Sequence, residues 1–163
     1  MADYTGKLRN MASVYLLRGE EVLLLHRQGN SIVSNLWIGS AGGHFEKDEL
    51  NDAKACVLRE LKEELGLGSE LLTGLQLRYV TLRYTDGEIR QNYYFFAQLS
   101  PKVSDIPVST EGYCQWFHFS ETSILPMPFT ARHMLDHYLA EGRYTDHLYG
   151  GIANTCGVNF HQL

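Results

Sequence analysis

The chain has 163 residues, of which 44% are hydrophobic and 20% charged, a composition that suits one globular domain with a real core. Its net charge of −5 argues against a broad nucleic-acid-binding face. No apolar run approaches the roughly 20 residues of a membrane span, and the start of the chain has no signal-peptide pattern. Three cysteines without a CxxC pair (Cys56, Cys114 and Cys156) are interpreted as small buried thiols in a reducing, cytoplasmic environment.

The order of apolar runs and turn residues predicts one α+β domain with a mixed β-sheet and two main helices. Strands are expected at residues 11–17, 22–26, 36–38, 76–84, 91–99 and 114–119. A loop is expected at residues 28–35, and a closing hairpin within residues 143–163. The first helix should run over residues 53–65, with Asp52 as its N-cap and Gly66 just past its end. The second should run over residues 129–140.

Three carboxylates gather on one side of the first predicted helix. Glu60, Glu63 and Glu64 have the spacing i, i+3, i+4, which places them within a 100° arc. Like charges so close together disfavour an isolated helix, but oxygen ligands suit a hard divalent cation. The apolar residues of the helix cover a neighbouring arc, so the carboxylates are expected at the rim of a cleft.

The segment around this helix resembles the signature box of the Nudix hydrolases. Gly43-x5-Glu49 matches the first part of that pattern, and Arg59-Glu60-Leu61-x-Glu63-Glu64-x-Gly66-Leu67 matches the second at every fixed position. Nine residues separate Glu49 from Arg59 where the family pattern has seven. We expect the two extra residues to bulge outward from a loop. The insertion leaves open whether Glu49 or Glu46 supports Arg59.

The resemblance implies an α/β/α sandwich with a catalytic loop–helix–loop. It also implies a hydrolase that cleaves a phosphoanhydride bond in nucleoside diphosphate derivatives with the help of Mg²⁺ or Mn²⁺. The implied metal ligands are the Gly42 carbonyl, Glu60, Glu63 and Glu64, with Glu111 as a further acid from a later loop. The implied catalytic residues are Glu60, Glu63 and Arg59. Glu60 is our choice of general base, and Arg59 is expected to orient the acidic face.

The substrate is harder to predict than the reaction. A MutT-like nucleoside triphosphate pyrophosphatase, acting on ordinary nucleotides or damaged ones such as 8-oxo-dGTP, is our first choice. Residues 126–131 lack the pair of acids with which some relatives read an oxidised guanine. ADP-ribose, sugar nucleotides, dinucleoside polyphosphates and RNA 5′ ends therefore stay open. Candidate substrate contacts are Arg27, Trp37, His44, Arg83 and Tyr94.

Two alternatives come from other functional classes. An isomerase of the isopentenyl-diphosphate type shares the fold, but its cysteine near the start of the box is replaced here by the run Ser40-Ala41-Gly42-Gly43. A non-catalytic nucleotide-sensing module usually loses box carboxylates, which this chain retains. A homodimer is common among relatives, although the sequence shows no interface.

Overall fold

A computed structural model describes residues 1, 4–29 and 35–163 of the chain. Part of the loop expected at residues 28–35 lies outside these residues. The strands are β1 (Leu8–Arg18), β2 (Glu21–Arg27), β3 (Trp37–Ile38), β4 (Ala41–His44), β5 (Leu72–Thr85), β6 (Glu88–Leu99), β7 (Gly112–His118), β8 (Tyr149–Asn154) and β9 (Gly157–Gln162). The helices are α1 (Ala53–Leu65) and α2 (Phe129–Ala140). Four short 3₁₀ turns are η1 (Lys47–Glu49), η2 (Ser69–Leu71), η3 (Phe119–Ile124) and η4 (Gly142–Tyr144).

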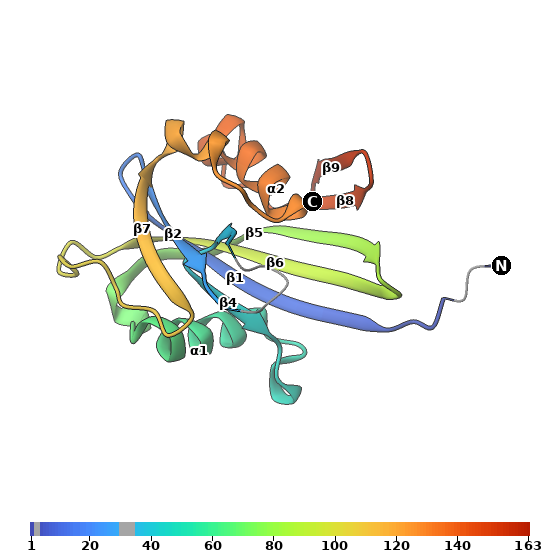
Figure 1. Cartoon of the computed structure of the whole chain (residues 1–163), viewed down its shortest axis with the longest axis horizontal. Helices are drawn as coiled ribbons and strands as arrows, with labels where there is room; N and C mark the ends of the chain where they lie inside the picture. The colour runs from blue at the N-terminus through green and yellow to red at the C-terminus, as the bar shows by residue number, and fades with distance from the viewer. Residues whose placement is uncertain (2–3, 30–34) are drawn as a thin grey trace.

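The described strands form one mixed sheet in the order β3-β2-β1-β6-β5-β8-β9. β4 pairs with the first part of β1, and β7 pairs with β2. β1 runs parallel to β6, whereas β5 and β6 form a long antiparallel hairpin. α1 and α2 lie on opposite faces of the sheet, so the chain has the predicted α/β/α layers (Figure 1).

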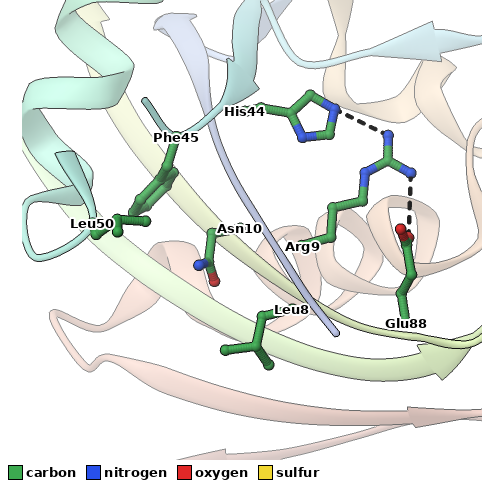
Figure 2. A pocket seen from close by; sticks show the side chains of 7 residues that line it. All are labelled: Leu8, Arg9, Asn10, His44, Phe45, Leu50 and Glu88. Carbon is green, nitrogen blue, oxygen red and sulfur yellow. Dashed lines mark hydrogen bonds and ion pairs between the residues drawn. The ribbon is translucent and has the colours of Figure 1, made fainter. Parts of the chain in front are cut away.

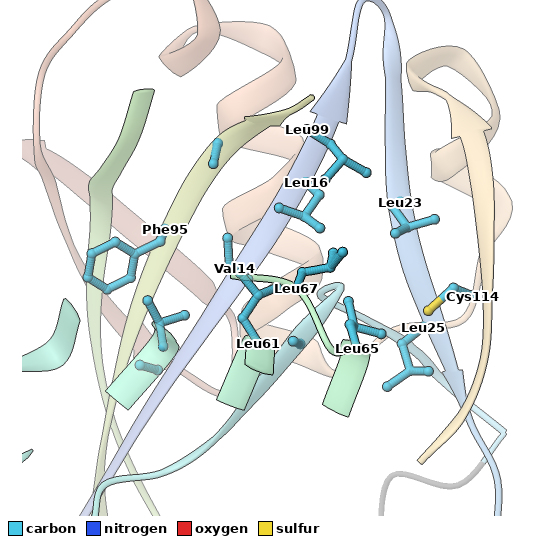
Figure 3. Packing of buried hydrophobic residues seen from close by; sticks show 14 of the residues in the cluster. Val14, Leu16, Leu23, Leu25, Leu61, Leu65, Leu67, Phe95, Leu99 and Cys114 are labelled. Atoms are coloured by element: carbon cyan, nitrogen blue, oxygen red, sulfur yellow. The ribbon is translucent and has the colours of Figure 1, made fainter. Parts of the chain in front are cut away.

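Alternating residues of the central strands feed two separate cores. On the α1 face, Val14 and Phe95 pack with Leu61 and other apolar residues of the helix (Figure 3). On the α2 face, Tyr15 and Phe96 pack around Met134. β6 is therefore buried on both faces, as expected for a central strand. The period-two alternation decides which residues of β1 and β6 face each helix.

The predicted elements are confirmed, with some differences at their ends. Both helices have the expected bounds, and residues 149–162 form the predicted hairpin. The β5–β6 hairpin is longer than predicted, because its partly polar ends continue the same ladder of pairs. Cys56 and Cys114 are buried, whereas Cys156 lies exposed in the β8–β9 turn, so that prediction was wrong for the third thiol. None of the helices in the described ranges is long and apolar enough to cross a membrane.

Candidate active site

The ends and the buried face of α1 fix the direction of its carboxylates. The Asp52 side chain accepts a hydrogen bond from the Ala55 amide (3.0 Å), which caps the N-terminus. Gly66 ends the helix in the left-handed conformation (φ 68°), where a residue without a Cβ carries no steric penalty. Val57 and Leu61 are buried in the core under the sheet. Because this face points inward, the glutamates are held along the side of the helix that borders β4.

Arg59 is the centre of the acidic cluster. Its Nε and Nη2 donate to the two carboxylate oxygens of Glu49, both at 2.9 Å, a bidentate pair with Glu49 only 5% exposed. Its Nη1 donates to Glu60 (2.8 Å) and to Glu63 (3.1 Å). Its Nη2 also donates to the His44 carbonyl (3.1 Å), which ties β4 to the helix. The Arg59 guanidinium therefore holds three carboxylates and the backbone at His44 in fixed positions.

The two inserted residues leave this pairing intact. η1 brings Glu49 back towards the helix, and the Glu49 carbonyl accepts a hydrogen bond from the Asp52 amide (2.8 Å). Leu50 and Asn51 lie exposed between η1 and the N-cap. Glu46 is farther from Arg59, at 3.8 Å. The structure thus places Glu49, rather than Glu46, in the main contact with Arg59.

Glu60 and Glu64 face a cavity of about 780 Å³ on the α2 side of the sheet. Oε2 of Glu64 accepts a hydrogen bond from the Gly42 amide (3.3 Å). A Cβ on Gly43 would collide with the Glu60 carboxylate, so the glycine lets β4 lie directly against this side chain. Burial, reinforced by the charge of Glu60, raises the pKa of Glu64 to about 8. Because Glu60 and Glu64 lie close together at a partly buried position, they favour the binding of a cation.

Arg27 and Glu111 face the same cavity from the ends of β2 and β7. Their side chains form an ion pair at 3.3 Å, and each is partly exposed. The Gln28 amide donates to the Glu111 carbonyl, which keeps these two chain segments together. The charge of Glu111 also contributes to the raised pKa of Glu64. Glu111, the later acid expected from the sequence, therefore lies near the box carboxylates, although about 50 residues separate it from them along the chain.

The remaining predicted residues divide between the cavity and its surroundings. His44 and Arg83 border the cavity, and the buried Tyr94 forms part of its wall. Burial and the nearby Arg9 guanidinium lower the pKa of His44, which favours its neutral form. Trp37 does not border the cavity, because its ring packs against His26, Tyr113 and Phe117. The Glu63 side chain is 57% exposed and points to Arg59 rather than into the cavity.

The donor set of the cavity fits a hard divalent cation. Glu60, Glu64 and the backbone at Gly42 lie together, and their oxygens are the ligands that Mg²⁺ and Mn²⁺ prefer. As they stand, no three Asp, Glu, His or Cys side chains of residues 1, 4–29 and 35–163 form a ready metal cage. The fit therefore rests on two carboxylates and a backbone oxygen.

Several residues of the cavity could not be identified from the sequence. Arg9, Asn92 and Phe129 all contribute to its lining. The first two lie on β1 and β6 at positions whose parity matches Tyr15 and Tyr94, which face the same side. The signal was available in the alternation of these strands, but only once their parallel pairing is known.

The fold is that of the MutT-type α/β/α hydrolases. A MutT protein structure from Bacillus halodurans is similar over 94% of this chain and 97% of its own, with 20% identity and a TM-score of 0.65. An Ap4A hydrolase complex from C. elegans is similar over 84% of this chain and 99% of its own (18% identity, TM-score 0.64). The NUDIX domain of Shewanella oneidensis NrtR, complexed with ADP ribose, is similar over 86% and 90% (18% identity, TM-score 0.60).

A model of the NUDIX domain matches residues 7–138, most of the chain. No curated protein sequence matches it. The chain therefore belongs to the NUDIX domain family, and its class is that of the Nudix pyrophosphohydrolases.

The Glu49–Arg59 pair gives a prediction on stability. Hydrogen bonds from Arg59 hold the pKa of Glu49 below its usual range, so the pair stabilises the fold above the carboxyl's ordinary pKa and loses this effect as the pH falls through the lowered value. Glu49→Gln should lower the free energy of unfolding at pH 7 by about 2 kcal/mol. Urea denaturation measures this loss, and the difference between the two proteins should shrink in acid.

Asp48→Asn is the matched control, since Asp48 lies exposed beside Glu49 in η1. It should change the free energy of unfolding by less than about 0.5 kcal/mol. Equal losses in the two variants at pH 7 would contradict the special role of Glu49.

Proposed function

We propose that the protein is a metal-dependent pyrophosphohydrolase that cleaves the phosphoanhydride bond of nucleoside diphosphate derivatives. The observation that carries this proposal is the Arg59-held pair Glu60 and Glu64, facing the cavity beside Gly42. In the reaction, water adds its oxygen to one phosphorus, the bridging P–O bond breaks, and the leaving phosphate accepts a proton. Two phosphate products result from one water molecule.

The metal ion, held by Glu60, Glu64 and the Gly42 carbonyl, would neutralise phosphate charge and make the water more acidic. The chain's own side chains orient the reaction. We assign to Glu60 the role of accepting the water proton, and its hydrogen bond with Arg59 at 2.8 Å limits its rotation. Arg27, paired with Glu111, is a cation that borders the same cavity and is suited to a phosphate oxygen. We therefore assign Arg59 to positioning and Arg27 to binding.

Within this class, a nucleoside triphosphate is the simplest substrate, as for a MutT-like enzyme. Derivatives with a larger group on the diphosphate are the second candidate. The volume of about 780 Å³ favours them, because it lies within the range of complete small-molecule sites. The likeness to an Ap4A hydrolase complex and to an ADP-ribose-bound domain agrees with either choice.

The carboxylates of α1 should differ in their contribution to turnover. Glu64→Gln and Glu60→Gln each remove a charge from the cavity and should lower kcat by at least about 10²-fold. Glu63→Gln should have a smaller effect, transmitted through Arg59, since this side chain points away from the cavity. Phosphate or pyrophosphate release with Mg²⁺ and a panel of nucleotides measures all three rates.

Glu70→Gln is the control, because Glu70 is an exposed acid beyond the end of α1. Circular dichroism should show the same fold in every variant. Near-normal Mg²⁺-dependent rates in both Glu60→Gln and Glu64→Gln would overturn the site. Inertness of the wild type towards the whole panel, together with tight binding of one compound, would favour a sensing module instead.

Metal binding can be tested without turnover. Mg²⁺ should raise the melting temperature of the wild type, because a cation that binds the native state through Glu60 and Glu64 stabilises that state. The Mg²⁺-induced rise in melting temperature should be much smaller in Glu64→Gln, whereas Glu70→Gln should show nearly the same rise as the wild type. Differential scanning fluorimetry measures the shift. An equal rise in all three proteins would mean that Mg²⁺ binds elsewhere.

A further inference from the structure

The N-terminus of α2 borders the large cavity and lacks a capping side chain. Pro128, which precedes the helix, offers no side-chain acceptor, and the first turn contains no acid. Among the described residues, no acceptor pairs with the amides of Phe129, Thr130 and Ala131. All four residues line the cavity. These N–H groups, at the positive end of the helix dipole, are therefore available to an acceptor that enters the cavity.

Thr130 adds a hydroxyl to this end of α2. The residue is only 7% exposed, yet it borders the cavity. In the described part of the chain its hydroxyl has no hydrogen-bond partner, whereas the buried Thr122 donates to the Phe119 carbonyl at 3.0 Å. Buried polar groups normally have a partner, because an unpaired one carries a desolvation penalty. The Thr130 hydroxyl therefore indicates a ligand on the cavity side.

Arg83 supplies a cation beside the same helix end. Its guanidinium lies over the ring of Phe129, the first residue of α2, at 4.8 Å from the ring centroid. Stacking holds the plane of a guanidinium and leaves the N–H groups at its edge free to donate. Among the residues that the structure describes, no hydrogen bond or ion pair involves the Arg83 side chain.

The other four arginines that border the cavity are already paired with carboxylates. Arg9, for example, lies 4.0 Å from Glu88 and donates to His44 at 3.1 Å (Figure 2). The remaining pairs are Arg27 with Glu111, Arg59 with Glu49 and Arg90 with Asp86. Within the described residues, Arg83 is thus the cavity arginine whose charge no carboxylate offsets.

The number of donors favours a phosphate over a carboxylate as the ligand. Three amides, one hydroxyl and the edge of a guanidinium exceed the roughly four acceptor positions of a carboxylate. A phosphate group presents more oxygens, and helix N-termini and arginine side chains both bind it recurrently. The absence of acids that argues against recognition of an oxidised guanine at residues 126–131 favours an anion at the same place.

We propose that the N-terminus of α2, together with Thr130 and Arg83, is a phosphate-binding site for the nucleotide. It lies on the wall of the cavity that β5 and α2 form, and it uses none of the box residues of α1. This inference rests on the proposed function only for the identification of the bound phosphate as part of the substrate.

Amide chemical shifts test the site without catalysis. Inorganic phosphate, titrated without metal into ¹⁵N-labelled protein, should shift the resonances of Phe129, Thr130 and Ala131, because each amide gains an acceptor. The first turn of α1, residues 53–55, is the internal control, since Asp52 already caps it. Acetate at the same ionic strength should cause smaller shifts. Equal responses of both helices, or of α2 to both anions, would overturn the site.

Side-chain variants connect the shifts to the proposed donors. Arg83→Gln should weaken phosphate binding at least about fivefold, and Thr130→Val about threefold, since each removes a hydrogen bond to an anion. Arg83→Lys should retain part of the affinity. The controls Lys102→Gln and Thr155→Val alter exposed residues outside the cavity and should keep the wild-type Kd. Purely structural roles of Arg83 and Thr130 would leave the Kd for phosphate unchanged in their folded variants.

ADP distinguishes a phosphate of the nucleotide from a free phosphate ion. It should shift the same α2 amides and displace inorganic phosphate, whereas adenosine, which has no phosphate, should shift none of them. ADP that binds without displacing phosphate would overturn the assignment to the substrate. Adenosine that shifts these amides would mean that the start of α2 contacts the base or the sugar, which would also overturn the proposal.

The two proposals can fail separately. Phosphate binding at α2 that ADP displaces, without hydrolysis of any nucleotide, would support the site and overturn the pyrophosphohydrolase. Hydrolysis by a protein whose α2 amides do not respond to phosphate would overturn the site and leave the enzymatic proposal intact.

Discussion

The contact on which the site depends is the bidentate pair between Arg59 and the buried Glu49. A guanidinium held at two nitrogens by one carboxylate has little freedom, so its third nitrogen and its remaining N–H are directed by that contact. They reach Glu60, Glu63 and the His44 carbonyl. The loop before α1, the helix itself and β4 are therefore held at one point. Breaking such a pair would leave a buried charge without a partner.

The same pair explains why two extra residues are tolerated in the box. The contact depends on the distance between the Glu49 and Arg59 side chains, not on the number of residues between them. η1 and the exposed Leu50 take up the additional length on the outside of the molecule. The cost of a longer surface loop grows slowly with length, so the contact is preserved. The number of residues between two motif positions can therefore vary, provided that the contact between their side chains is kept.

Much of the fold could be predicted because its signals are local. The cap at Asp52, the glycine after Leu65 and the periodicity between them define α1 to the residue, and the turn at Asp86 and Gly87 marks the β5–β6 hairpin. The environment of Trp37 could not be predicted in this way, since it depends on the ring of Tyr113 from a distant strand. The direction of the Glu63 side chain likewise depends on which neighbouring groups Arg59 contacts in the folded structure.

Three arginines that line the cavity show the same limit most clearly. Arg9 is far in the sequence from Arg83 and Arg90, which lie seven residues apart across the β5–β6 turn. They form a set only because β1 runs parallel to β6 while β5 runs antiparallel to it, in one particular register. A shift of one residue in either pairing would move one arginine to the α1 face. The cavity carboxylates Glu60 and Glu64 come from one helix, whereas the three arginines are brought together by sheet register.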